Sequence, residues 1–332
     1  MFCLSAVFSV FCVGFVSVYF LYEYLYCKPG SVLEYNGTPP GTVGLIFSFI
    51  MQSVRKKRGK INTDQREKQP LIYTLTNCRY EELSLRRYCS TVGYGWDYPD
   101  STFRDIPLFY PQYLCSPLMS ILKCSQLFCL SPYGLACVSE RVCLRQPLDE
   151  LKKGAFSLQV GEREYRKVES GVEVDLSLCL RRDQKNVEEE QAEGWSSIIT
   201  LLSPITTYSH MLQSHTDTTD ECVWCVSVLV PWWARGVFSG VFLPLFFSIG
   251  SVGCPASLWG VSRCLAETEK VKGADAVRAP LSLTVRYSQP LLLPKTVNIR
   301  IFQTESSQTH YSFHLEESTT HKLLIAGEIQ RP

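Results

Sequence analysis

Two cysteines three residues apart, Cys222 and Cys225, have a spacing that can serve metal or disulfide chemistry. They lie in a Val-rich run that predicts a strand. Residues three apart in a strand point to opposite faces, so the two sulfur atoms should diverge. His310 and His314 would share a face, but a rise of about 3.3 Å per residue puts them about 13 Å apart. We therefore predict no metal site and no cofactor.

Acid–base groups are absent from one long segment. Between Glu221 and Glu267 there is no Asp, Glu, His or Lys, and a guanidinium such as that of Arg235 or Arg263 cannot act as a base. Residues 236–262 carry no charge over 27 positions, which is long enough to cross a bilayer. Repeated Gly and Pro favour a buried core segment instead, and a second membrane span is the alternative.

Length and composition narrow the class of protein. The 332 residues fit two packed domains better than one small one. A hydrophobic content of 45% is ordinary for a globular protein. With 33 basic against 32 acidic residues, the net charge of +1 gives no field to hold a phosphate backbone, so we expect no nucleic-acid partner.

The amino terminus has the features of a membrane anchor. Residues 1–22 carry no charged side chain, and at about 1.5 Å per residue they span roughly 33 Å, against a hydrocarbon core of about 30 Å. A cleaved signal peptide is the alternative. Lys28 and the basic cluster at 55–60 follow the span, which predicts a single-pass protein with its bulk facing the cytosol.

A short apolar stretch, residues 44–54, leads into that basic cluster. It is too short to span a bilayer. It could lie in the membrane interface with the cations on acidic headgroups, or it could be a linker helix packed on the soluble domain. We interpret residues 61–101 as a connection to the first domain.

After Arg104 one set of elements occurs twice. A helix-like stretch at 112–127 precedes strand-like runs at 135–148, 156–164, 172–182 and 194–204. A second at 256–270 precedes runs at 281–294, 296–304, 310–318 and 322–329. The period-two alternation predicts antiparallel sheets covered on one face, and the helix of each half is the element that can cover it. The predicted fold class is α+β.

These elements and several short motifs resemble the double-hotdog MaoC-like family of (R)-specific enoyl-CoA hydratases and dehydratases. In the first half the motifs are Arg104-Asp105-Ile106-Pro107, Tyr110-Pro111 and Ser116-Pro117-Leu118. In the second half they are Pro231, Ser239-Gly240, Pro244, Leu258-Trp259, Arg263 to Glu267, and Tyr287 to Pro294. The resemblance covers about two thirds of the chain.

The resemblance implies a site that this sequence does not complete. The family's segment reads Ser-Gly-Asp-x-Asn-Pro-x-His, and its Asp and His activate the water that adds to an enoyl thioester. Here Val241 stands at the acid position and Phe246 at the imidazole position, so no catalytic residue is predicted. By resemblance, the substrate-binding residues are Ser239, Gly240, Pro244, Ala256 and Ser257.

We accordingly expect a transmembrane anchor at 1–22, a juxtamembrane basic linker at 23–101, and hotdog halves at 102–220 and 221–332. We expect a membrane-anchored protein of lipid metabolism whose function is to bind a fatty acyl thioester such as acyl-CoA. It would be a pseudoenzyme of hydro-lyase ancestry. One alternative is an active enoyl-CoA hydratase, dehydratase or thioesterase whose true transcript restores the Asp and His. Another is a two-span membrane adaptor. The expected partners are membrane lipid and the thioester, and a homodimer is left open.

Overall fold

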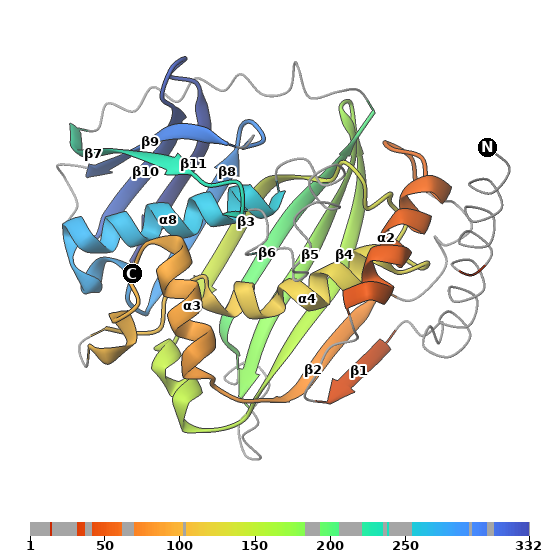
Figure 1. Cartoon of the computed structure of the whole chain (residues 1–332), viewed down its shortest axis with the longest axis horizontal. Helices are drawn as coiled ribbons and strands as arrows, with labels where there is room; N and C mark the ends of the chain where they lie inside the picture. Colours follow the sequence, from red (N-terminus) through yellow and green to blue (C-terminus); the bar gives the residue numbers. More distant parts are fainter. Residues whose placement is uncertain are drawn as a thin grey trace, which may run out of the picture.

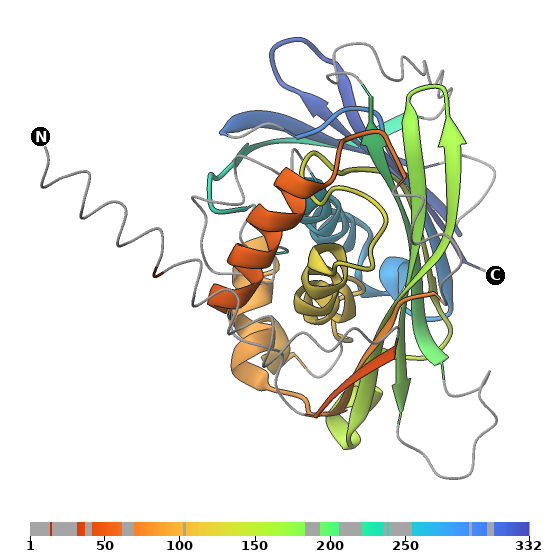
Figure 2. The ribbon, with the colours of Figure 1, turned by 90° about the vertical axis from the view of Figure 1, so that its right-hand side faces the viewer.

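The computed structural model describes residues 14, 32–36, 42–61, 70–101, 104–182, 193–205, 221–234, 238, 254–291, 294–303 and 309–331. Within these ranges the strands form one 11-stranded sheet in the order β1-β2-β4-β5-β6-β3-β8-β11-β10-β9-β7. The described helices lie on one side of this curved sheet (Figures 1 and 2). The amphipathic strands thus bury one face against a helical layer.

The sheet contains the same arrangement of strands twice. The first half comprises β2 (Ile72–Cys78), β3 (Ala136–Leu144), β4 (Phe156–Val168), β5 (Gly171–Arg182) and β6 (Glu193–Pro204). The second comprises β7 (Glu221–Val230), β8 (Leu281–Tyr287), β9 (Lys295–Gln303), β10 (His310–Glu317) and β11 (Leu323–Gln330). The predicted duplication is therefore confirmed, with one further strand before the helix in each half.

The two halves join edge to edge at β3 and β8, which pair antiparallel with Glu140 opposite Val285. We call this junction the seam. Because the seam is a continuous hydrogen-bonded ladder, the two halves share one sheet and one core.

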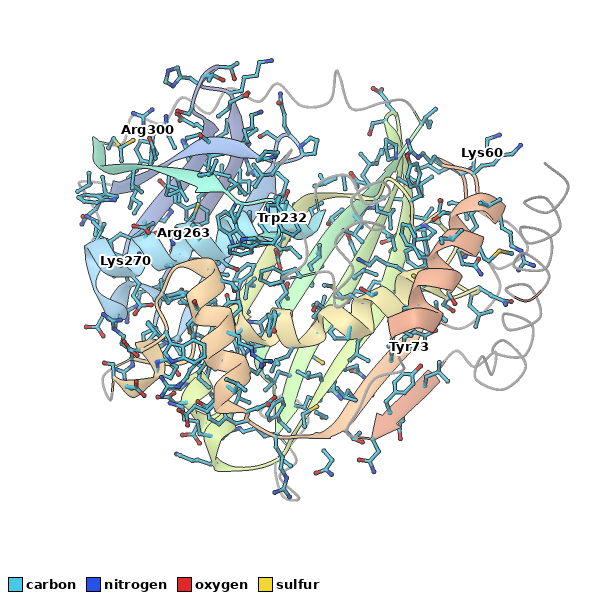
Figure 3. All side chains as sticks on the ribbon, in the orientation of Figure 1. Lys60, Tyr73, Trp232, Arg263, Lys270 and Arg300 are labelled. Atoms are coloured by element: carbon cyan, nitrogen blue, oxygen red, sulfur yellow. The ribbon has the colours of Figure 1, made fainter. Side chains whose placement is uncertain are left out.

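One long helix covers each half. Helix α4 (Tyr110–Cys124) packs on β2, β4 and β5, and α8 (Cys254–Lys272) packs on β3, β9, β10 and β11. Leu258, Trp259 and Leu265 are among the buried side chains of α8. Glu267 on α8 forms ion pairs with Arg263 at 2.7 Å and with Lys270 at 2.8 Å. Figure 3 shows both cations along this helix. Gly260 of α8 lies close to Leu315 of β10 and Ile325 of β11, so this helix covers the sheet as the sequence pattern predicted.

The segment expected to be a linker, residues 23–101, contributes to the folded domain. It contains β1 (Val32–Asn36), α2 (Thr42–Arg55), β2, α3 (Glu82–Val92) and the short helix η2 (Tyr98–Asp100). Strand β1 pairs parallel with β2, and β2 pairs with β4. Leu71, Tyr73 and Leu75 alternate toward the core. This alternation is short and lies within a polar stretch, so the sequence alone does not predict a strand there. The prediction of a linker over residues 23–101 was wrong for this reason.

Helix α2 is packed on the domain, which is the second of the two alternatives for residues 44–54. Leu45 and Phe49 are buried. The Lys56 ammonium, just beyond the helix, donates to the carbonyl oxygens of Ser125 at 2.9 Å and Phe128 at 2.5 Å. Burial lowers the pKa of Lys56 to about 8. One residue of the basic cluster therefore anchors the helix to the loop after α4 instead of facing lipid.

Most residues of the predicted anchor and part of the uncharged run at 236–262 lie outside the described residues. Apart from Gly14, residues 1–22 lie outside the described residues, so the anchor stays a prediction. Among the helices that the structure describes, none has the length and apolar character needed to cross a bilayer. The two-span adaptor is wrong, because residues 254–262 of the uncharged run begin α8 and the second half forms a helix with five strands.

A bulge overturns the predicted divergence of Cys222 and Cys225. The register of β7 on β9 shifts between Cys222 and Trp224, so Cys222 lies opposite Phe302 and Cys225 opposite Arg300. Since Phe302 and Arg300 are two residues apart, the two cysteines share a face. Both are free thiols. Trp224 and Leu229 are exposed on this edge strand.

Asp105, in the first motif of the family resemblance, has a structural role. Its carboxylate accepts hydrogen bonds from the backbone N–H groups of Ile106 at 2.8 Å, Leu148 at 2.9 Å and Asp149 at 2.6 Å. Leu148 and Asp149 open the short helix η3 (Leu148–Lys153). Asp105 thus connects the entry of α4 to the turn that follows β3.

Candidate functional site

The residues predicted to bind substrate fall into two groups. Ser239, Gly240 and Pro244 lie outside the described residues, as do the motif positions Val241 and Phe246. Ala256 and Ser257 lie in the first turn of α8, where both are buried, at 0% and 2% exposed. The structure therefore defines the two ends of the motif segment and not its interior.

Aromatic side chains surround the described ends of this segment. Phe238, which precedes Ser239, is buried, and its ring centroid lies 6.2 Å from that of Tyr88 on α3 and 6.1 Å from that of Tyr113 on α4. The indole N–H of Trp259 donates to the carbonyl oxygen of Thr91 at 2.9 Å. Helix α3 therefore packs between the start of α4 and the start of α8, and it makes this region largely apolar.

The described histidines do not supply the missing imidazole. His310 and His314 lie on β10, where they alternate with Phe313 and Leu315, which belong to the core. Since Leu315 lies within reach of Gly260 on α8, the two imidazoles point to the opposite face of the sheet. His321 lies in the turn between β10 and β11.

A buried polar cluster lies instead at the seam. Glu140 is fully buried on the helix-facing side of β3, in line with Val142 and Leu144. Its carboxylate accepts hydrogen bonds from the hydroxyl of Ser197 on β6 and from the hydroxyl of Tyr287 on β8, both at 2.8 Å. We call these three residues, with Gln112 of α4, the seam cluster.

Gln112 completes the cluster from the helical side. It is fully buried, and its side chain favours the ionised form of Glu140. Neither amide atom makes a hydrogen bond of normal geometry. Burial raises the pKa of Glu140 to about 7, although Tyr287, Ser197 and Gln112 act to lower it. A buried carboxyl that titrates near neutral pH is a group suited to binding or proton transfer.

One feature of the sequence, outside the family motifs, indicates this cluster. Glu140 occupies an inward position in the alternation of β3, between Ser139 and Arg141. A carboxylate at such a position must be paired or neutralised. Tyr287 belongs to a motif of the family resemblance, but its role as a partner of Glu140 depends on the register of β8 on β3.

Glu140 gives the protein a pH-dependent stability of definite sign. A glutamate in the unfolded chain titrates near about 4.3, whereas Glu140 in the folded protein titrates near 7. The folded state binds more protons between these values, so the free energy of unfolding should fall as the pH rises through this window, by about 1.4 kcal/mol per pH unit at most. Urea denaturation at about pH 5 and pH 7 measures the slope. Glu140→Gln should flatten it, and an unchanged slope in that variant would contradict this assignment.

Comparisons with known proteins match the fold. No protein-family model and no curated protein matches the sequence. HtdX of Mycobacterium tuberculosis is similar over 78% of this chain and 98% of its own, with 16% identity and a TM-score of 0.54. A MaoC-like dehydratase from Phytophthora capsici is similar over 82% of this chain and 99% of its own, with 14% identity and a TM-score of 0.56. This chain has the MaoC-like hotdog fold.

The MaoC-like fold also occurs within a longer protein. The peroxisomal multifunctional enzyme type 2 of Drosophila melanogaster is similar over 78% of this chain and 48% of its own, with 11% identity and a TM-score of 0.53. At these sequence identities the structural similarity establishes the fold alone. The chemistry has to be argued from the residues of this chain. The family resemblance in the sequence is thereby confirmed at the level of the MaoC-like fold.

Proposed function

We propose that this chain binds a fatty acyl thioester at the junction of its two halves and does not hydrate it. The observation that carries the proposal is a complete MaoC-like double hotdog, with α4 and α8 in place, whose motif positions hold Val241 and Phe246. Such a frame supplies an apolar environment for an acyl chain. Two apolar side chains at the acid and base positions cannot activate water.

Calorimetric titration of the full chain with decanoyl-CoA tests the binding. A dissociation constant on the order of 10 μM, equivalent to about 7 kcal/mol, is expected for a buried acyl chain of this length. Coenzyme A without an acyl group is the control, and it should bind at least about tenfold more weakly. Equal binding of the two, or binding of neither, would refute acyl recognition.

We also propose that residues 1–22 anchor the protein in a membrane with the folded part on the cytosolic side. Their length and freedom from charge support the span, and the basic residues that follow it support the orientation. Alkaline extraction of membranes, with a chain lacking residues 1–31 as the comparison, tests the anchor. Release of the full chain into the soluble fraction would contradict it.

A further inference from the structure

Two free thiols lie together on the edge strand of the second half. Cys222 and Cys225 share a face of β7 because of the bulge before Trp224. They lie opposite Phe302 and Arg300 of β9, two positions apart, so their Cα atoms are about 6.6 Å apart. Disulfide bonds usually join Cα atoms that are roughly 4.4 to 6.8 Å apart, so a bond between these two sulfur atoms fits the backbone. We call the two cysteines the β7 pair.

The side chain of Cys222 lies along the strand in the direction of Cys225. Its Sγ atom donates to the carbonyl oxygen of Trp224 at 3.4 Å. This carbonyl belongs to the peptide that links Trp224 to Cys225, so the sulfur lies beside the backbone of Cys225. Cys225 is exposed and Cys222 is partly exposed. A small oxidant in solution can therefore reach both thiols.

A guanidinium group lies next to Cys222. Arg300 of β9 donates to the Cys222 sulfur, and this contact raises the pKa of Arg300. Glu316, at 3.4 Å, and the ring of Phe302, at 5.4 Å, hold the guanidinium in place. Figure 3 shows Arg300 beside β7. A cysteine reacts as the thiolate, and a neighbouring cation stabilises that negative charge. Cys222 therefore has the surroundings of a reactive cysteine.

The buried cysteines have the opposite surroundings. Burial raises the pKa of five described free thiols and keeps them protonated, namely Cys89, Cys115, Cys124, Cys129 and Cys264. A protonated thiol is a poor nucleophile, and the packing around it excludes an oxidant. Oxidation should therefore begin at the β7 pair and spare these five thiols.

We propose that the β7 pair is a site of reversible oxidation by hydroperoxides. The Cys222 thiolate attacks one peroxide oxygen and the O–O bond breaks, which leaves a sulfenic acid on Cys222 and releases the other oxygen as water or an alcohol after it takes up a proton. The Cys225 thiolate then attacks the sulfenic sulfur. The S–S bond forms, and the hydroxide that leaves takes up a proton to give water. Two thiols thus lose two electrons to the peroxide, and a dithiol reductant reverses the step.

Peptide mapping of the full chain by mass spectrometry tests this site. After brief treatment with hydrogen peroxide at a concentration close to that of the protein, the remaining thiols are blocked with N-ethylmaleimide. The peptide that contains Cys222 and Cys225 should then be recovered without label and lighter by two hydrogen atoms. Reduction with dithiothreitol before blocking should restore two labels. Cys143, a half-buried thiol on β3, should carry the label in both samples.

Three variants assign the roles of the side chains. Cys225→Ser should stop the reaction at the sulfenic acid, which dimedone traps on Cys222. Arg300→Gln should slow the oxidation of Cys222 by about 3- to 10-fold, because a charge is removed from beside the sulfur. Arg286→Gln is the matched control. Arg286 is exposed on the same face of the sheet, on β8, and β11, β10 and β9 separate it from β7, so this variant should react at the wild-type rate.

The mapping uses the wild-type chain, so its result does not depend on the folding of any variant. A bond between Cys222 and Cys225 that forms with peroxide and is lost with dithiothreitol supports the proposal. Equal labelling of the β7 pair and Cys143 after peroxide overturns it. Oxidation of Cys222 to the sulfinic acid alone, or bonds that join the β7 pair to other cysteines, also overturns it.

Discussion

Hydration of crotonyl-CoA and of longer trans-2-enoyl-CoA thioesters by the full chain should be at least about 10⁴-fold slower than by a MaoC-like dehydratase assayed in parallel. One positioned acid–base group typically contributes about 10²- to 10⁴-fold, and here Val241 and Phe246 stand at both motif positions. The described imidazoles of His310 and His314 point to the other face of the sheet. The loss of ultraviolet absorbance of the conjugated enoyl thioester measures the rate.

Glu140 supplies the internal control for this assay. It is a carboxyl of pKa about 7 on the helix-facing side of the sheet. Background hydration by wild type should be the same in Glu140→Gln. If wild type hydrated the substrate and Glu140→Gln did not, the seam cluster would perform the acid–base step. The proposal that this chain does not hydrate thioesters would then be wrong.

Replacing Asp105 with alanine should lower the free energy of unfolding by about 2–4 kcal/mol. The substitution removes the acceptor of three backbone N–H groups. Each hydrogen bond to a charged group contributes about 1.5–3 kcal/mol, and the total loss is smaller than three such bonds because water can reach the released N–H groups. Asp105→Asn, which retains one acceptor oxygen, should lose less. Chemical denaturation followed by circular dichroism measures both.

Asp100 is a matched control for this effect. Its carboxylate also pairs, with Arg86 at 3.0 Å, but its side chain is 57% exposed. Asp100→Ala should cost less than about 1 kcal/mol, as exposed ion pairs usually do. Similar losses in the two alanine variants would show that Asp105 does not hold the turn after β3 in the way described.

The repeated core of the fold could be predicted from sequence because its signals are local. The run at 281–294 alternates with period two, and in β8 Leu281, Leu283, Val285 and Tyr287 are the buried residues. Strand β2 and helix α3 were missed because they lie among polar residues and owe their place to long-range partners, such as β4 for β2. The bulge at Cys222 depends on pairing with β9, which no local pattern encodes.

The candidate site was predictable only in part, for a similar reason. The sequence predicted a helix that begins near Ala256, and the structure confirms it, whereas the substrate-binding role of Ala256 and Ser257 stays a prediction. The seam cluster joins residues from 112 to 287, and Glu140 meets Tyr287 only through the register of β3 on β8. A pairing across 147 positions depends on tertiary structure, and short motifs do not report it.

Strand β1 determines where the first 31 residues leave the folded part. It is the outermost strand of the sheet beside β2, at the edge opposite β7 (Figure 1). The chain therefore enters the sheet at its β1 edge, and at the opposite edge the outer side of β7 pairs with no other described strand. An anchor held in a bilayer would then leave the β7 edge, where Trp224 and Leu229 are exposed, at the other end of the described sheet.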